Sequence, residues 1–567
     1  MASPESQFKA VFPFIEWLKG YGLSDLGKDF LAGLTVVVVM IPQVMAYASL
    51  AGLPPVHGLY AAFLGTAAAA LWGSSRHLST GPAAVVSFLV LTALVPLAEP
   101  ESPEFIVFAI ILALSVGLIQ LLMGFFKLGF LMNFVSHSVI GGFTTAAAII
   151  IAATQLPGLF GFSIKKHEVV LNNFYEIFSS LPSTHGLTSI IGLIAVVIIV
   201  ASKKLISKAF PAGLLVMAGG ILLSFFMNLE SQGVAVVGDI NASLSLPSVP
   251  YISFGKFLEL VPSALIIAVI GFLEGYAISK SISERSKQQI DVNQELKGQG
   301  IGNIFSGLFK GYPIAGSFSR TAVNYTAGAV SGVSSVFASL FVLLTILYFT
   351  QYLYYLPKTL LSAIVIAALV DLIEFSKFRQ TFNLSGTDGV VIITTFVFAF
   401  LTKPDTAIFV GMAVSLILFL RKTIAVKVKP VVFNFEDERF DSIEMYGGER
   451  DYDNLLIVRI DMSIYFGNVY GIRDQILELV KRKGDDLEHV VISFTSVNYF
   501  DVSACEVFAE LFDDLNHKGL KVYTMYRKRQ VEEIMKGSGL EEKMIRLRDI
   551  KGFKKAFVIQ RNPGFKV

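Results

Sequence analysis

The chain has 567 residues, with 46 Lys or Arg and 44 Asp or Glu, so its charged share of 16% lies well below the roughly 25% usual in soluble proteins. Half of these charges, 45, lie in residues 431–567, where about one residue in three is charged, against about one in ten before them. A soluble domain with so few charges could not cover its surface with polar groups. The first part is therefore predicted to be embedded in a membrane, and the last part to be an ordinary soluble domain.

This composition excludes a cytosolic enzyme, a secreted disulfide scaffold and a nucleic-acid binder. The single cysteine, Cys505, cannot form an internal disulfide, and a net charge of +2 carries no information about partners. No cleavable signal peptide is evident, and residues 1–28 are predicted to form a cytoplasmic lead-in along the membrane surface. The histidines of the membrane part lack metal-ligand spacing, so we expect no metal ion and no cofactor.

Fourteen apolar segments follow in chain order, each a candidate membrane span. They lie near residues 30–50, 57–73, 82–98, 104–127, 131–154, 187–203, 207–228, 261–280, 291–309, 317–330, 331–350, 358–372, 386–402 and 404–420. The ninth, 291–309, is polar and glycine-rich, so it is expected inside a helix bundle, with a surface amphipathic helix as the alternative. An even number of spans places both termini on the same side of the membrane.

Lysine and arginine in short loops predict the orientation, because cytoplasmic loops carry more of them. With the N-terminus in the cytoplasm, the inner loops hold most of these charges, among them Lys203, Lys204, Arg285, Lys287, Lys377 and Arg379. Both termini and the charge-rich tail are therefore expected in the cytoplasm, and the protein in a plasma or inner membrane.

The third and tenth spans are interrupted in matching ways. RHLSTGP precedes the third and GYPIAG precedes the tenth, so each short helix follows an extended stretch rich in Gly and Pro. Interrupted segments at corresponding positions of two halves indicate a transporter site built from inverted repeats. Seven spans in each half would make the two half-helices enter from opposite sides, with their N-termini facing each other. The alternative is that these residues only kink ordinary spans.

Two converging helix N-termini favour a negatively charged cargo. Each end behaves like about half a positive charge and offers unpaired backbone N–H groups. We therefore expect the site to bind an anion.

Two ionisable residues lie within predicted spans, where such residues are costly and default to a functional role. They are Glu274 in ALIIAVIGFLEGYAISK and Arg320 in AGSFSRTAVN. Arg320 and two helix ends sum to roughly +2, which suits a doubly charged anion, whereas ionised Glu274 would subtract one. Burial and a nearby anion both favour the protonated carboxyl, so proton and anion should bind together. The alternative is a structural ion pair between two helices.

Gln43 follows Pro42 in the middle of the first span, and Tyr47 lies one turn later on the same face. Proline frees a backbone carbonyl there, and the amide is a polar group at membrane depth. Gln43 is a candidate ligand, with a simple helix kink as the alternative.

Several of these motifs resemble the SulP anion permeases, which include plant and bacterial sulfate transporters. The resemblance rests on IPQVMAYASLAGLPPVHGLYAAF, GPAAVVS, FLEGYAIS, NQELKGQGIGNIFSGLFKGYPIAGSFSRTAVN and LPKTLLSAIVIAAL, and it covers nearly the whole chain. It implies an α-helical membrane protein with seven plus seven inverted repeats and two half-helices. It also implies an elevator-type motion of a core domain against a gate domain, usually in a homodimer.

Carried over by position, the resemblance implies a substrate pocket formed by Gln43, Tyr47, Ala83, Ala84, Ser317, Phe318, Ser319 and Arg320. Glu274 would be the proton-coupling carboxylate. Sodium-coupled bicarbonate members carry Asp followed four residues later by Thr, whereas this chain has Glu274 and Ile278. The resemblance therefore favours protons over sodium.

From about Asp451 short β-like runs alternate with amphipathic helices, which is typical of a small α/β domain. Strands are predicted at LLIVRID, SIYFGN, HVVISFT and KVYTMY, and helices near 470–483 and from Ser503 to about Lys518. This part resembles the STAS domain of SulP proteins, so the expected organisation is a transporter domain at 29–425 and a linker with STAS domain at 426–567. Ser503 is predicted to cap its helix, with a regulatory phosphosite as the alternative. Cys505 is expected to be an inert core residue.

The favoured function is a secondary active anion transporter, most specifically proton-coupled sulfate symport. The alternatives are transport of bicarbonate, chloride or dicarboxylate, an anion channel on the same scaffold, and a membrane-anchored signalling protein whose tail is the working part. The expected partners are sulfate or a similar inorganic anion, protons, the lipid bilayer, a second copy of the chain, and cytosolic regulators acting through the STAS domain. We expect neither enzymatic activity nor nucleic-acid binding.

Overall fold

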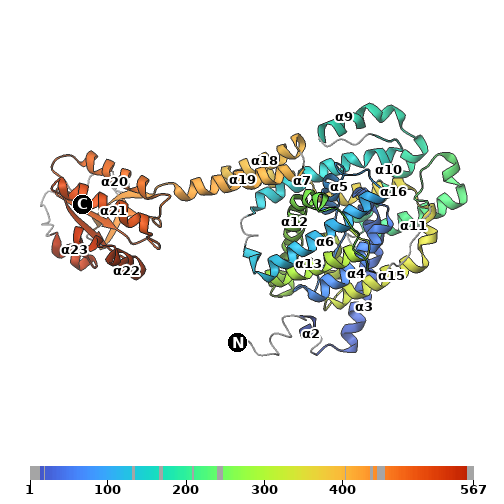
Figure 1. Ribbon diagram of the computed structural model, residues 1–567, viewed down its shortest axis with the longest axis horizontal. Helices are drawn as coiled ribbons and strands as arrows, with labels where there is room; N and C mark the ends of the chain where they lie inside the picture. Colours follow the sequence, from blue (N-terminus) through green and yellow to red (C-terminus); the bar gives the residue numbers. More distant parts are fainter. Residues whose placement is uncertain are drawn as a thin grey trace. The chain divides into compact units, whose positions relative to one another are not determined.

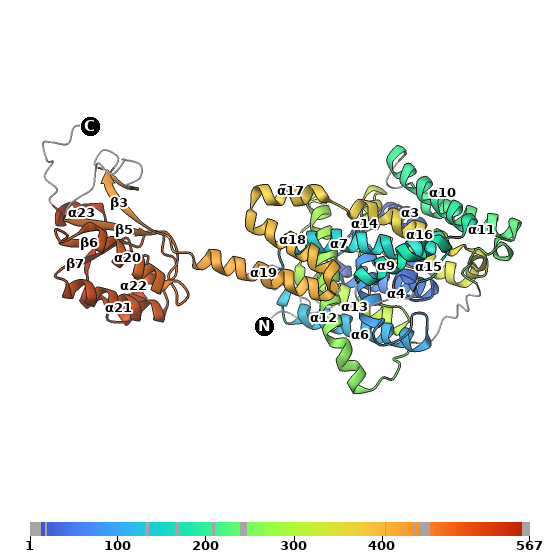
Figure 2. The same cartoon turned by 90° about the horizontal axis from the view of Figure 1, so that it is seen from above.

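The computed structural model describes residues 13–17, 20–130, 135–164, 170–206, 210–238, 247–402, 404–434, 438–442 and 454–557. The chain divides into two compact units, residues 1–416 and 417–567, which are called here the helical unit and the sheet unit. Helix α19 (Pro404–Ile424) runs across the division. Figures 1 and 2 show the two units from two directions, and each is described by itself.

Each of the fourteen predicted segments contains a helix, as expected from its apolar composition. In chain order these are α3 (Leu23–Leu50), α4 (Val56–Trp72), α5 (Ala84–Leu94), α6 (Pro103–Phe125), α7 (His137–Thr154), α10 (Gly186–Leu205), α11 (Ala212–Met227), α12 (Phe254–Ser286), α13 (Val292–Leu308), α14 (Phe318–Thr326), α15 (Val333–Tyr348), α16 (Lys358–Leu369), α18 (Gly386–Leu401) and α19. Among the described residues of the helical unit, four short α-helices were not predicted: α2 (Phe14–Trp17), α8 (Leu156–Phe160), α9 (Val170–Ser180) and α17 (Phe375–Leu384). Helix α3 begins at Leu23, before the expected start near residue 30. Much of the predicted lead-in, residues 1–12, 18 and 19, lies outside the described residues.

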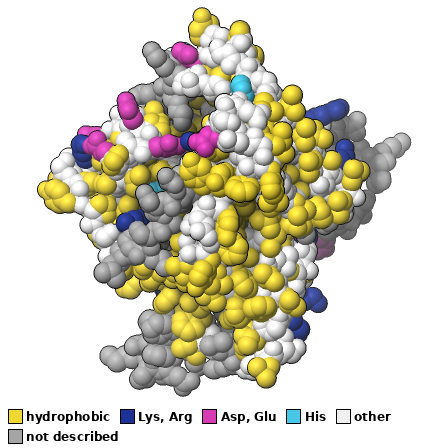
Figure 3. Space-filling view, turned by 90° about the vertical axis from the view of Figure 1, so that its right-hand side faces the viewer, with side chains coloured by type: hydrophobic (Ala, Val, Ile, Leu, Met, Phe, Trp, Pro, Cys, Tyr) yellow, Lys and Arg dark blue, Asp and Glu magenta, His cyan; other side chains and the backbone are white. Residues whose placement is uncertain are grey.

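By length and composition, six helices of the described chain could cross a membrane: Leu23–Leu50, Pro103–Phe125, His137–Phe160, Gly186–Leu205, Phe254–Ser286 and Thr406–Ile424. Six shorter apolar helices accompany them, whereas α13 and α14 fall in neither group. The count of fourteen spans therefore stays a prediction. One face of the molecule carries a broad area of hydrophobic side chains, as a lipid-facing surface requires (Figure 3).

Helix α13 lies inside the helical unit, so the alternative of a surface amphipathic helix is wrong. Its glycines allow backbone-to-backbone packing: a Cβ at Gly298 would lie 2.4 Å from Gly73, and one at Gly300 would lie 2.7 Å from the Leu121 nitrogen. Several of its polar residues bond within the bundle, although the buried Gln299 amide has no partner among the described residues. Asn303 is fully buried and donates to the side chain of Gln120 at 3.0 Å.

The sheet unit is built on one six-stranded sheet of order β4-β3-β5-β6-β7-β8. Strands β5 (Leu455–Ile460), β6 (His489–Ser493), β7 (Lys521–Met525) and β8 (Ile545–Leu547) are parallel, and their crossovers contain helices, as parallel strands require. Strands β3 (Val428–Asn434) and β4 (Arg439–Ser442) form an antiparallel hairpin, and β3 pairs antiparallel with β5.

Two apolar cores cover the two faces of this sheet (Figure 2). Helices α20 (Val469–Lys483), α21 (Val502–His517) and α22 (Arg529–Gly537) bury residues such as Ile476, Phe508 and Met535 in one core. Helix α23 (Ile550–Ala556) buries Phe553 in the other. Both faces are covered, which explains the near-continuous apolar strands of the sequence.

The tail differs from the predictions in several details, and helices α22 and α23 and strand β8 were not predicted. Residues 463–468 do not form a strand, and Ile464 makes only an isolated bridge with Phe500. Strands β3 and β4 extend the sheet into a segment expected to be linker. The cap of α21 is Asp501, whose Oδ1 accepts from the Ala504 amide at 2.8 Å, so the prediction of Ser503 as the cap is wrong. Cys505 is buried in the core, as expected.

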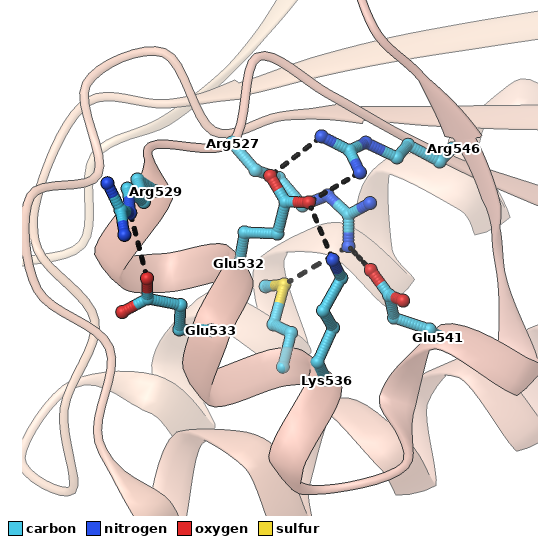
Figure 4. Close-up of polar contacts among 8 residues, drawn as sticks. Arg527, Arg529, Glu532, Glu533, Lys536, Glu541 and Arg546 are labelled. Carbon is cyan, nitrogen blue, oxygen red and sulfur yellow. Dashed lines mark hydrogen bonds and ion pairs between the residues drawn. The ribbon is translucent and has the colours of Figure 1, made fainter.

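A cluster of ion pairs joins α22 to the chain around it (Figure 4). Glu532 accepts from the Arg546 Nη2 at 2.7 Å and lies 3.2 Å from the Lys536 ammonium. The side chain of Arg527 is only 2% exposed and pairs with Glu541 at 3.1 Å. Burial lowers the pKa of Arg527, while Glu541 stabilises its charge. The cluster fixes α22 to strand β8 and to the loop that follows β7.

Candidate functional site

The two predicted half-helices start from a short two-stranded ribbon. Strand β1 (Thr80–Gly81) leads into α5, and β2 (Ala315–Gly316) leads into α14. The strands are antiparallel, with Thr80 opposite Gly316 and Gly81 opposite Ala315. Because each strand runs directly into its helix, antiparallel pairing sends the helices in opposite directions and leaves their N-termini as neighbours. This confirms the predicted arrangement of half-helices, although the sequence did not indicate the strand pairing itself.

Neither half-helix has a side-chain cap at its N-terminus. The capping positions are Ala83 and Ser317, both with extended backbone, and neither side chain accepts a hydrogen bond from the first turn. The first N–H groups of a helix have no partner within the helix. Two helix ends whose N–H groups lack such caps therefore meet at one place, which is a favourable setting for an anion.

Close glycine contacts place α12 and Arg320 beside the ribbon. A Cβ at Gly316 would lie 2.5 Å from the Gly275 Cα, so α12 approaches β2 backbone to backbone. This contact brings the neighbouring Glu274 to the site. A Cβ at Gly81 would lie 3.2 Å from Nη2 of Arg320, so the guanidinium occupies the space that a side chain there would need.

Helix α3 presents Gln43 and Tyr47 to the same place. Both side chains are buried, and the Gln43 amide donates to the Ser319 hydroxyl at 3.4 Å. The amide oxygen of Gln43 is buried without a hydrogen-bond partner in the described structure. A buried polar atom without a partner is costly, so its presence indicates a ligand or an ordered water.

Eight of the nine predicted transport residues line one cavity of about 80 Å³, several times the space that one water molecule needs. They are Gln43, Tyr47, Ala83, Ala84, Glu274, Ser317, Phe318 and Ser319. The remaining lining residues are Lys203, Ala368 and Leu372. Residues from four distant parts of the sequence thus meet around the two helix ends.

Arg320, the ninth predicted residue, does not line this cavity. Its side chain is fully buried, and Nη1 donates to the Pro82 carbonyl at 2.9 Å. Nε and Nη2 of Arg320, and Oε2 of Glu274, have no hydrogen-bond partner among the described residues, so these two side chains are not bonded to each other. The guanidinium lies behind the ribbon, where it can act on a bound anion through its charge.

A larger cavity of about 970 Å³ adjoins the small one and shares Glu274, Phe318, Ser319, Lys203 and Leu372 with it. Its other lining residues come from α3, α5, α7, α12, α14, α17 and α19 and from the segment between α16 and α17. Glu374 and Lys377, which border it, follow a span predicted to end in the cytoplasm. We name this larger cavity the vestibule.

Sequence reasoning missed three lining residues, Lys203, Ala368 and Leu372, of which Lys203 carries a charge. Lys203 lies in the last turn of α10. Because of its positive charge, the sequence predicts it to lie in a cytoplasmic loop. The structure instead places it at the wall of both cavities. No local pattern distinguishes it from Lys204, because only the packing of α10 against α16 decides which lysine faces inward.

The described residues contain no group of three or more His, Cys, Asp or Glu side chains that could hold a metal ion. The cavity itself is lined by helix ends, an amide, hydroxyls and the charged groups named above.

The chain is similar to known proteins along nearly its whole length. The sulfate permease family matches residues 26–395, and the STAS domain matches residues 449–552. A probable sulfate transporter 4.2 of Arabidopsis thaliana is 30% identical over 549 residues, covering 94% of this chain and 81% of the relative. High affinity sulfate transporter 2 of Stylosanthes hamata is 29% identical over 534 residues, covering 90% and 80% of the two chains.

Two solved structures share the fold. The murine Solute Carrier 26 family member A9 anion transporter, in its inward-facing state, has a TM-score of 0.91 at 24% identity and covers 98% of this chain and 96% of its own. The transmembrane domain of a cyanobacterium bicarbonate transporter, BicA, has a TM-score of 0.59 at 24% identity and covers 70% and 98%.

Proposed function

The chain belongs to the sulfate permease family and carries a STAS domain after its permease part, and from this premise we propose that it transports sulfate together with protons across a membrane. The relatives named as sulfate transporters support the cargo. The observation that carries the proposal is the cavity between the two half-helix N-termini, with a buried, unpartnered amide oxygen at its wall.

The charges around this cavity suit a doubly charged anion. The two helix ends contribute about one positive charge in total, and Arg320 contributes another from behind the ribbon. Backbone N–H groups and the hydroxyls of Ser317, Ser319 and Tyr47 can donate to oxygen atoms of the anion. Sulfate offers four such oxygens and two negative charges.

Glu274 is the proposed proton carrier. It lines both the cavity and the vestibule, and its Oε2 has no partner among the described residues. An ionised carboxylate there would repel the incoming dianion, so protonation favours sulfate binding and sulfate favours protonation. Because linkage is reciprocal, cargo and proton would move together.

An elevator-type motion would let the site face each side of the membrane in turn. The cavity is lined by the half-helices with α3 and α12, and also by Lys203, Ala368 and Leu372 from other elements. A cavity between two sets of elements supports a mechanism in which one set slides against the other. We also propose a homodimer with both termini in the cytoplasm, as the family resemblance implies.

The test is labelled sulfate uptake into proteoliposomes, with and without an inward proton gradient. We expect the gradient to accelerate uptake by the unaltered protein. In the E274Q variant a neutral amide replaces the carboxyl, so uptake should continue but become indifferent to the gradient. E284Q, at an exposed position of the same helix, is the matched control and should behave as the unaltered protein.

Equal rates with and without the gradient in the unaltered protein would contradict proton coupling. Sulfate conductance that ignores the gradient would identify an anion channel instead. The same assay with bicarbonate, chloride and dicarboxylates as competitors tests the alternative cargoes, because helix ends distinguish the charge of anions better than their identity.

A further inference from the structure

The lining of the cavity includes a cation, Lys203, which comes from α10 and not from the half-helices. It is the single lysine or arginine among the described residues that line the cavity, since Arg320 lies behind the ribbon. Resting on the proposed function, we propose that Lys203 of α10 binds the anionic cargo, so that sulfate contacts both the helix N-termini and an ammonium group.

The geometry holds the Lys203 ammonium at the cavity wall. Its Nζ donates to the Ala367 carbonyl at 2.8 Å, in the last turn of α16. The next residue, Ala368, itself lines the cavity. The same lysine also borders the vestibule and a third, smaller cavity of about 50 Å³ that contains Gln43 and Ser319. Lys203 thus lies where all three cavities meet.

The chemistry of an ammonium suits this position. A lysine carries three N–H donors, so it can hold a carbonyl and meet an anion at the same time. It binds oxyanions as a point charge and lacks the rigid bidentate geometry of an arginine guanidinium. This less constrained binding suits a cargo that must also be released. Its charge adds to that of the two helix ends and of Arg320 around an anion with two negative charges.

A simpler role for Lys203 is to cap the C-terminus of α16, since cations stabilise the last carbonyls of a helix. The two roles differ in what replacement does. Glutamine keeps an N–H donor for the Ala367 carbonyl but removes the charge, so K203Q separates cargo binding from capping. Lys204, the exposed neighbour in the same turn, provides a matched control.

The experiment measures the concentration dependence of sulfate uptake in proteoliposomes for the unaltered protein, K203Q, K203R and K204Q. We expect K203Q to raise KM for sulfate by about tenfold with its unfolding temperature in the absence of sulfate unchanged. K203R should stay within about threefold of the unaltered protein, and K204Q should match it. An unchanged KM in K203Q, or equal defects in K203Q and K203R with a lowered unfolding temperature, would overturn the proposal in favour of a capping role.

A chemical rescue keeps the test decisive if K203Q does not fold. Cys505 is the one cysteine of the chain and is buried, so a C505A protein offers a background for K203C. Modification with aminoethyl methanethiosulfonate restores a positive charge and should restore sulfate uptake, whereas the neutral methyl reagent should not. Rescue by both reagents, or by neither, would overturn the proposal. If instead the unaltered protein carries no sulfate, the proposed function fails and not this inference alone.

Discussion

Arg320 is a buried charge beside the candidate site that does not line its cavity. Its guanidinium is fully buried and donates to the Pro82 carbonyl, and two of its nitrogen atoms, Nε and Nη2, have no hydrogen-bond partner in the described structure. A buried charge whose hydrogen bonds are incomplete lowers the stability of the fold. Such a charge is therefore expected where a function requires it. The space for it exists because Gly81 has no side chain. We infer that Arg320 acts on the cargo through its electric field.

Removal of the Arg320 charge should weaken sulfate binding. We expect R320A to raise the sulfate KM at least tenfold, equivalent to about 1.4 kcal/mol or more of binding free energy. R320K keeps the positive charge and should recover part of this loss, although it lacks the planar fork. Uptake measured at a series of sulfate concentrations provides the values. An unchanged affinity in R320A would show that the helix ends and other groups suffice without this charge.

Ser503 illustrates the limit of motif reasoning at the scale of one residue. Asp501 and Ser503 are both good capping residues, and the sequence alone does not choose between them. The structure selects Asp501, whose carboxylate also accepts from the Phe466 amide at 2.9 Å. Ser503 therefore lies in the first turn of α21, and its role as a phosphosite stays a prediction.

Among the elements, the β1–β2 ribbon decides the position of the site. It holds the starts of both half-helices together, and further bonds fix its surroundings. Thr66 donates to the Thr80 carbonyl at 2.7 Å, and Asn303 accepts from the Ile314 amide at 2.8 Å. Helix α13 thus supports the ribbon from within the bundle, which explains why a polar, glycine-rich helix is buried there.

A methyl group on Gly316 should break this arrangement. Its Cβ would lie 2.5 Å from the Gly275 Cα. Because this contact is between two backbones, the clash could be relieved only by moving α12 away from the ribbon. We expect G316A to lose sulfate uptake and to lower the unfolding temperature of the solubilised protein. G255A is the control, because a Cβ at Gly255 in the same helix α12 meets nothing within 4 Å. Normal uptake in G316A would mean that the contact between α12 and β2 is dispensable.

For the molecule as a whole, the main feature is the division into two units with separate cores. The sheet unit buries its own aromatic cluster, in which Phe508 packs against Phe494, Phe500 and Phe512. The helical unit contains the complete cavity of the candidate site. We therefore expect damage to the core of the sheet unit to leave the site intact.

The variant F508A tests this independence. Loss of a fully buried phenylalanine costs about 3–5 kcal/mol of unfolding free energy, so the sheet unit should be strongly destabilised. Hydrogen exchange in the full-length protein should rise in strands β5, β6 and β7, and sulfate should still protect α5 and α14. F466A removes a side chain that is 72% exposed and should change neither. Faster exchange in α5 and α14 of F508A would show that the two units depend on each other.

By itself the sequence determined the properties that depend on local composition. Long apolar runs are helical wherever they lie in the bundle, and a break by glycine and proline acts on its own segment, so the helices and the two half-helices could be predicted. Family motifs identified eight residues that line one cavity. The tertiary structure alone decided what depends on partners distant in the chain: the pairing of β1 with β2, the burial of Arg320 behind them, the joining of β3 and β4 to the sheet, and the entry of Lys203 into the cavity wall. Each of these needs a second surface, and no pattern within one segment describes the surface against which it packs.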